Sequence, residues 1–133
     1  MAETFVLEIE QDTDNYLWWA YELPDGTVAD LSTVGDGYDT GWLQVRDKHR
    51  SEGGELMLSL TTDNGGVVIE YQLDDDGEAW SGYCYVSAAA TSTLEPWGDA
   101  VCELRVGDPA GRRLTIVKGG AQLNPATVDE SEV

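Results

Sequence analysis

The chain has 133 residues, close to the commonest size of a single domain, and carries 26 acidic against 7 basic residues, a formal net charge of −19. Such a surface repels nucleic-acid phosphates and anionic lipid headgroups, so we expect neither a nucleic acid nor a membrane as partner. The charge is uneven, because residues 1–45 contain ten Asp or Glu and no Lys or Arg. A basic partner or bound cations would balance that end, and a need for solubility is the plainer explanation.

Short segments with alternating apolar and polar residues recur along the chain and predict an all-β fold. Turn residues such as Asp-Gly and Gly-Gly separate the segments at the spacing of an Ig-like antiparallel β-sandwich of eight or nine strands. The expected strands are 4–10, 16–23, 41–47, 55–61, 67–72, 79–86, 100–107, 112–118 and 121–124. We expect one domain over residues 1–126 and a mobile acidic tail over 127–133.

The alternation also predicts which side chains face the core. In the segment 100–107 the apolar side chains share one face, namely Ala100, Cys102, Leu104 and Val106. In the segment 79–86 the expected inner face consists of Trp80, Gly82, Cys84 and Val86, with Ser81, Tyr83 and Tyr85 opposite. Between these segments Ser87 is the expected N-cap of a single helical turn that ends before Pro96.

Little in the sequence indicates catalysis, a cofactor or a metal. Cys84 and Cys102, the only cysteines, are expected to be free buried thiols, with a disulfide as the alternative. The single histidine, His49, lies in a charged segment expected to be a loop, without an orienting partner nearby. The acidic run 74–78 is expected to be a solvated hairpin turn; calcium binding there, or at Asp12 and Asp14, is the alternative. No nucleotide-binding, zinc-protease or hydrolase motif is present, and we expect a protein that is not an enzyme.

The N-terminus lacks the basic segment and the apolar core of a signal peptide, and no apolar run approaches the roughly 20 residues of a membrane span. We therefore expect synthesis in the cytoplasm.

Five tryptophans are many for this length, and two of them, Trp18 and Trp19, are adjacent. In a strand they must point to opposite faces, so one of them is expected outside the core. Tryptophan and tyrosine suit an interface anchor because they combine a large apolar area with a polar tip. The alternative is coverage by a loop of the same chain. The residues expected at interfaces are the aromatic Tyr16, Trp18, Trp19 and Tyr21 and the basic Arg46, Lys48 and Arg50.

Several motifs follow one another over residues 5–126 in a fairly specific order and spacing. They are QDT at 11–13, PDGT at 24–27, DLS at 30–32, GWLQVRD at 41–47, LSLTTDNGGVVI at 58–69, VSAAAT at 86–91, VCELRV at 101–106, DPAG at 108–111, and then Gly120 and Pro125. In this order they resemble a family of small β-sandwich proteins of tailed bacteriophages, especially phages of actinobacteria. Cys102 and Glu103 depart from the family, which tends to have Tyr-Asp there.

The resemblance implies a minor tail protein of the virion, in the tail tip, baseplate or tail-fibre base, where it would act as an adaptor between the tail and fibre or receptor-binding proteins. Its partners would be other phage tail proteins and further copies of itself. The alternative from charge alone is an acidic protein that mimics DNA and inhibits a nucleic-acid enzyme. Regularly spaced carboxylates along one extended face would favour that alternative, and carboxylates scattered over turns would not.

Overall fold

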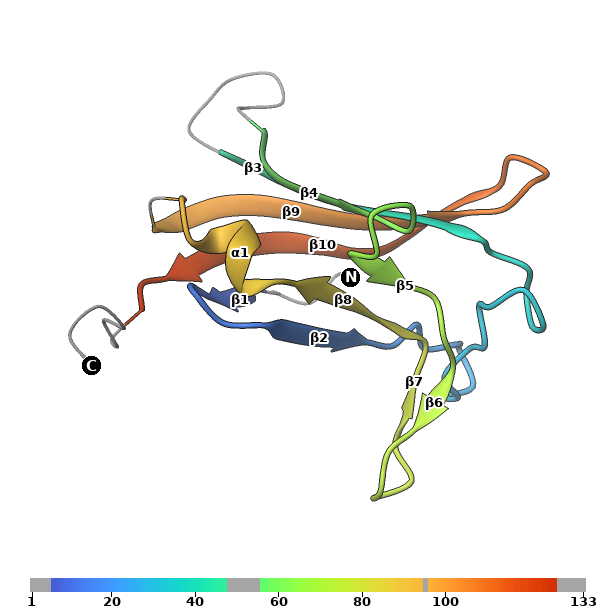
Figure 1. The fold of residues 1–133 in the computed structure, drawn as a ribbon. Coiled ribbons are helices and arrows are strands. Elements are labelled where there is room, and N and C mark those ends of the chain that lie inside the picture. The colour runs from blue at the N-terminus through green and yellow to red at the C-terminus, as the bar shows by residue number, and fades with distance from the viewer. Residues whose placement is uncertain (1–5, 48–55, 95, 127–133) are drawn as a thin grey trace.

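The computed structural model describes residues 6–47, 56–94 and 96–126, which form ten strands and one helix. The elements in chain order are β1 (Val6–Glu10), β2 (Asn15–Trp19), β3 (Thr40–Asp47), β4 (Leu56–Thr61), β5 (Val67–Val68), β6 (Gln72–Leu73), β7 (Ala79–Trp80), β8 (Gly82–Val86), α1 (Ala88–Thr91), β9 (Trp97–Gly107) and β10 (Arg113–Asn124). The strands dominate and stack as a sandwich (Figure 1), so the expected all-β sandwich fold is confirmed.

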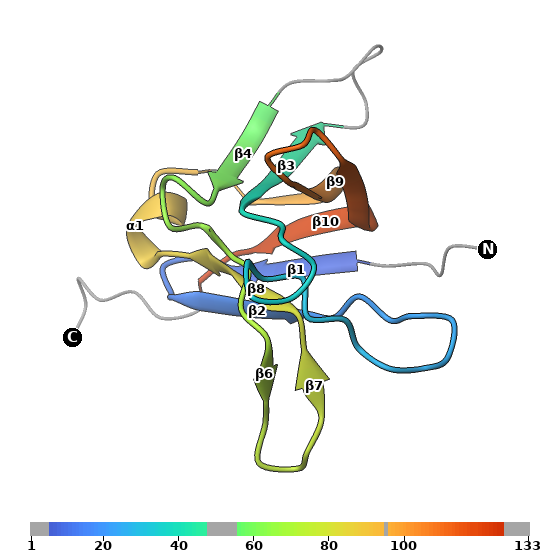
Figure 2. The ribbon, with the colours of Figure 1, turned by 90° about the vertical axis from the view of Figure 1, so that its right-hand side faces the viewer.

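A five-stranded sheet and a three-stranded sheet form the two layers. The larger sheet has the order β1-β10-β9-β3-β4 and the smaller sheet the order β2-β8-β5. The β6–β7 hairpin forms a separate small sheet that projects away from both layers (Figure 2). One pairing departs from the expected antiparallel arrangement, because β1 runs parallel to β10. A parallel pair needs a long crossover, and nearly the whole chain lies between these two strands.

The core lies between the two sheets, and the predicted inner faces are largely correct. Ala100, Cys102, Leu104 and Val106 are all buried on β9, and Gly82, Cys84 and Val86 are buried on β8. Trp80 and Ser81 are the exceptions, because the expected strand 79–86 divides at Ser81. Trp80 is half-buried, and Ser81, expected on the outer face, is buried. The hydroxyl of Ser81 donates to the carbonyl of Ala29 at 2.8 Å and accepts the amide of Tyr21 at 3.0 Å, which turns the chain out of the sheet.

Other strand boundaries also differ from the prediction. The segment 67–72 divides into β5 and β6, while 112–118 and 121–124 join as the single strand β10. Gly119 and Gly120, which lie between the two expected segments, continue the antiparallel pairing with β9 opposite Cys102 and Val101. The helical turn is confirmed, since the Ser87 hydroxyl accepts the amide of Ala90 at 3.2 Å.

Candidate functional site

The two cysteines are buried and unbonded, as predicted. Burial raises the pKa of the Cys84 thiol to about 12, and burial likewise raises the pKa of Cys102. A thiol attacks substrates or binds metals as the thiolate, which these sites disfavour. The sulfur of Cys102 instead donates to the carbonyl of Gly120 at 3.4 Å, inside the larger sheet. Both cysteines therefore have a packing role.

The acidic run 74–78 is a hairpin turn between β6 and β7, as predicted. One carboxylate oxygen of Asp74 accepts the backbone amides of Asp76 and Glu78, each at 2.9 Å, and the other accepts the Trp80 indole at 3.3 Å. These bonds, first of all that of Glu78, lower the pKa of Asp74. The Asp74 oxygens thus stabilise the hairpin turn. Within the described residues, no cluster of three metal-ligating side chains occurs.

The adjacent tryptophans point to opposite faces of β2, as the alternation required. The side chain of Trp19 is buried in the core, whereas Trp18 is 38% exposed and Tyr16 is 59% exposed on the outer face. Tyr21 lies beyond the end of β2 and packs against the core. Trp19 is therefore the inward tryptophan and Trp18 the outward one, Tyr21 is half-buried, and Lys48 and Arg50 lie outside the described residues.

Pairing of β2 with β8 adds two further rings to the outward pair. Tyr16 lies opposite Tyr85 and Trp18 opposite Tyr83, so all four rings occupy the outer face of the smaller sheet. Their centroids are 4.7 Å apart for Trp18 and Tyr83, 6.0 Å for Tyr83 and Tyr16, and 5.0 Å for Tyr16 and Tyr85. These distances are those of aromatic contact. We call this continuous row of four side chains the aromatic face.

The Asp14 carboxylate borders one end of the aromatic face. Partial burial and the neighbouring Asp14 raise the pKa of Tyr85, so its hydroxyl remains a protonated donor at neutral pH. Asp14 itself accepts the amide of Ala88 at 2.9 Å, at the start of α1. The aromatic face therefore combines apolar rings with hydroxyl groups at their edges, as interface residues typically do.

A second candidate surface lies on the outer face of the five-stranded sheet, opposite the aromatic face. It is an open hollow of about 660 Å³ over β3, β9 and β10. Its charged lining consists of Arg46, Arg105, Arg113, Lys118 and Glu103, a net charge of +3 on a chain whose total is −19. Four of the chain's seven basic residues thus line one site. We call it the basic hollow.

Strand register arranges the basic hollow in three cross-strand rows. Arg105 on β9 lies opposite Trp42 on β3; Lys118 on β10 lies opposite Glu103, which lies opposite Gln44. In the third row Val101 lies opposite Arg46. Neighbouring rows are two residues apart, about 7 Å along a strand. Arg105 also pairs with Glu103 at 3.2 Å, and Arg46 donates to Gln44 at 3.0 Å.

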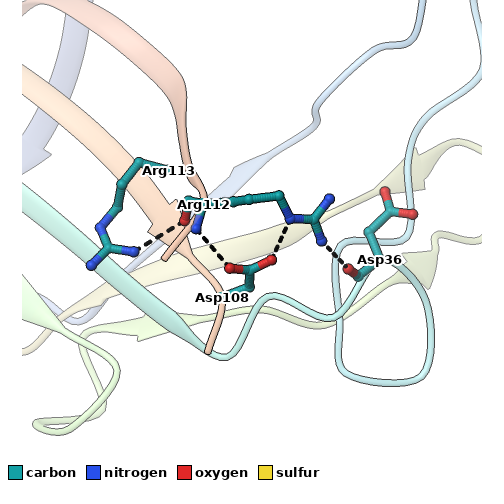
Figure 3. Close-up of polar contacts among 4 residues, drawn as sticks. All are labelled: Asp36, Asp108, Arg112 and Arg113. Atoms are coloured by element: carbon teal, nitrogen blue, oxygen red, sulfur yellow. Dashed lines mark hydrogen bonds and ion pairs between the residues drawn. The ribbon is translucent and has the colours of Figure 1, made fainter. Parts of the chain in front are cut away.

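Arg112 and Arg113 follow the turn between β9 and β10 (Figure 3), and Arg113 lines the hollow. The Asp108 carboxylate accepts the Arg112 amide at 2.8 Å and pairs with the Arg112 guanidinium, which also donates to the carbonyl of Asp36 at 3.2 Å. Partial burial opposes ionisation of Asp108, but the bonds from Arg112 outweigh it and lower the pKa. The neighbouring Arg113 extends over the Trp42 ring, 5.2 Å from its centroid.

Several residues of these surfaces were missing from the predicted interface. They are Tyr83 and Tyr85 of the aromatic face, and Trp42, Arg105, Arg113 and Lys118 of the basic hollow. The alternation had already placed Tyr83, Tyr85 and Arg105 on outward faces. What it lacked was the strand order that brings them beside Tyr16, Trp18 and Arg46. Of the predicted basic segment, Arg46 lies at the hollow, and the other two residues lie outside the described part of the chain.

Compared with known proteins, the chain matches no protein-family model and no curated protein sequence. Within the described residues, no helix has the length and apolar character needed to cross a membrane.

Proposed function

We propose that this protein is a structural subunit of a tailed-phage virion, a minor tail or baseplate adaptor present in several copies that joins the tail tip to fibre or receptor-binding proteins. It binds neighbouring protein subunits and catalyses no reaction. The aromatic face is the surface by which it docks on a neighbouring tail protein. The order of motifs along the chain supports the phage assignment, and the geometry of the smaller sheet supports the docking role.

The observation that carries the docking role is the exposure of Trp18 and Tyr16 beside two further rings. A sheet face turned to water usually presents polar side chains, yet this one presents Tyr16, Trp18, Tyr83 and Tyr85 in continuous contact. Burying an outward tryptophan against a partner contributes on the order of 2 kcal/mol or more to binding. Among the described surfaces, the aromatic face therefore offers the largest gain in binding free energy when a neighbouring protein buries it.

The two cysteine thiols give no support to an enzymatic alternative. Both thiols face the core and have raised pKa values, so neither is poised as a nucleophile. The Arg112 guanidinium at the β9–β10 turn is held by Asp108 and the carbonyl of Asp36. These features support a binding role.

The DNA-mimic alternative gains no support from the placement of the carboxylates. Glu8, Glu10, Asp12 and Asp14 alternate in sequence, but the row breaks after Glu10, because Asp12 adopts a left-handed conformation (φ 61°) and Asp14 caps α1. Many other carboxylates lie on turns, such as 25–26, 63–65 and 74–78. A mimic of a phosphate backbone needs an extended, evenly spaced row.

Replacement of the outward tryptophan tests the proposal. We expect Trp18→Ala to retain the wild-type thermal midpoint to within a few degrees, because the ring lies outside the core, and to reduce incorporation into particles at least tenfold. Incorporation is measured by immunoblotting purified virions of the phage that encodes the protein, with the variant supplied in place of the native chain.

Tyr71→Ala is the matched control, since Tyr71 is an aromatic residue 39% exposed, lies between β5 and β6, and makes no ring contact with the aromatic face. It should enter particles at the wild-type level. Absence of the wild-type chain from purified virions would overturn the virion assignment. Wild-type incorporation of a folded Trp18→Ala chain would overturn the docking role of the aromatic face.

A further inference from the structure

The basic hollow is out of keeping with the rest of this acidic protein. Five basic residues lie in the described part of the chain, and four of them line the hollow. The fifth, Arg112, is held by Asp108 and the carbonyl of Asp36. Among the described residues, electrostatic attraction to an acidic neighbour therefore acts mainly through the hollow.

An acidic edge lies on the same outer face of the same sheet. Glu8 and Glu10 project outward from the edge strand β1, in register with Gln122 and Asn124 of β10. Glu8 accepts the Gln122 amide at 2.8 Å and Glu10 accepts the Asn124 amide at 2.9 Å, so neutral amides orient both carboxylates and leave their charge uncompensated. We call these two residues the acidic edge.

We propose that the basic hollow binds the acidic edge of a second copy of this chain. The spacing supports this occupant: Glu8 and Glu10 are two residues apart on a strand, about 7 Å, which is also the separation of neighbouring rows in the hollow. Carboxylates at that spacing reach Arg105 in one row and Lys118 in the next, and charge-assisted hydrogen bonds follow.

The acidic edge cannot fill the hollow of its own chain. Gln122, the partner of Glu8, lies four residues beyond Lys118 on β10, about 13 Å along the strand. The backbone pairing of β1 with β10 prevents the edge from moving closer. The hollow therefore needs carboxylates from another molecule.

Placement of both patches on one face permits a closed pair. A two-fold axis between them, lying in the plane of contact, brings each acidic edge over the hollow of the other copy. Both contacts form at once in such a pair, and no binding surface is left to extend the assembly. The inference rests on the proposed multi-copy function, and it uses the face opposite the aromatic face.

Charge reversal on each side provides the test, with self-association measured by sedimentation velocity in 50 and 300 mM NaCl. The wild-type chain should form a reversible dimer whose affinity falls about tenfold or more at the higher salt. Arg105→Glu with Lys118→Glu should be monomeric because its hollow is acidic. Glu8→Lys with Glu10→Lys should be monomeric because its edge is basic. A mixture of these two double variants should recover a dimer, since each hollow then meets an edge of opposite charge.

The control is Asp75→Lys with Asp76→Lys, which changes the net charge as much as the edge variant does but on the β6–β7 turn. It should dimerise at least as well as the wild type, and circular dichroism melts confirm that every variant folds. Failure of the mixture to dimerise would overturn the proposal. So would a dimer that strengthens with salt and is lost in Trp18→Ala, because the contact would then be the aromatic face.

A synthetic hexaglutamate peptide distinguishes a foreign acidic partner from a second copy. A wild-type chain that stays monomeric but binds hexaglutamate, with Arg105→Glu and Lys118→Glu abolishing that binding, would overturn the second copy as occupant. Failure of the mixed charge variants to dimerise, with virion incorporation still dependent on Trp18, would overturn the second copy as occupant and leave the docking role intact. The two proposals therefore fail independently.

Discussion

At the scale of single residues, burial decides what Cys84 can do. Its sulfur lies inward on β8 between the sheets, where a thiolate would lose its hydration, and the pKa rises from 9.0 to about 12. The same alternation that buries Cys84 exposes its neighbours Tyr83 and Tyr85 on the other side of the strand. One strand thus supplies an inert thiol to the core and two rings to the aromatic face.

The raised pKa of Cys84 predicts a loss of stability in alkaline solution. The unfolded thiol ionises near pH 9 and the folded thiol near pH 12, so this contribution to stability is complete below about pH 9 and is lost as pH rises toward 12. We expect the unfolding free energy of the wild type to fall more steeply above pH 9 than that of Cys84→Ala, by up to about 1.4 kcal/mol per pH unit. Urea titrations from pH 8 to 11 measure both slopes. Equal slopes would contradict the prediction.

At the scale of elements, a glycine sets how closely β8 approaches its neighbours. A Cβ on Gly82 would lie 2.3 Å from the carbonyl oxygen of Val68 and 2.5 Å from the ring of Trp19. Because the Val68 oxygen belongs to the backbone, no change of side-chain rotamer can relieve this clash. Gly82 therefore allows β5 to pair with β8 while the buried Trp19 packs beneath them.

Gly82→Ala should lower the free energy of unfolding by about 1–3 kcal/mol, because the added methyl overpacks the core and separates the strands. Gly98→Ala is the control, since a Cβ at Gly98 has no atom within 4 Å, and it should change stability by less than about 0.5 kcal/mol. Chemical denaturation monitored by circular dichroism measures both variants. A Gly82→Ala chain as stable as Gly98→Ala would show that the three-stranded sheet tolerates a wider spacing.

At the scale of the whole molecule, charge is strongly segregated. The net charge is −19, and within the described residues carboxylates lie on turns such as 74–78 and on the edge strand β1, while four basic side chains gather in the basic hollow. Repulsion among the carboxylates is greater in the compact fold than in the extended chain. The net charge therefore lowers the free energy of unfolding.

Screening that repulsion should stabilise the monomer. We expect the thermal midpoint at low protein concentration to rise as NaCl increases from 10 to 150 mM, because the Debye length shortens from about 30 to about 8 Å. Choline chloride at equal ionic strength should have the same effect, since the cause is screening. A midpoint that does not rise with salt would contradict the prediction. A rise with CaCl2 well beyond that expected from its ionic strength would point to a bound cation.

Local patterns predicted much of the fold and part of the candidate site. Alternation correctly placed Cys102 and Leu104 inward and required one of Trp18 and Trp19 to face outward, because successive side chains of a strand point to opposite sides. Boundaries were wrong where a tertiary contact overrode the pattern. Ser81 interrupts an apparently continuous strand by binding the carbonyl of Ala29, far away in the chain.

The sequence by itself determined that the chain forms strands, which side chains of each strand share a face, and how acidic the protein is, since these depend on neighbours in the chain. Only the tertiary structure decided which of the two tryptophans is outward, that β1 runs parallel to β10, and that the rings of β2 and β8 form one surface. The same holds for the basic hollow, where Arg46, Arg105 and Lys118 come from three strands. Strand order depends on how the sheets bury their inner faces together, and alternation within one strand carries no information about its partner.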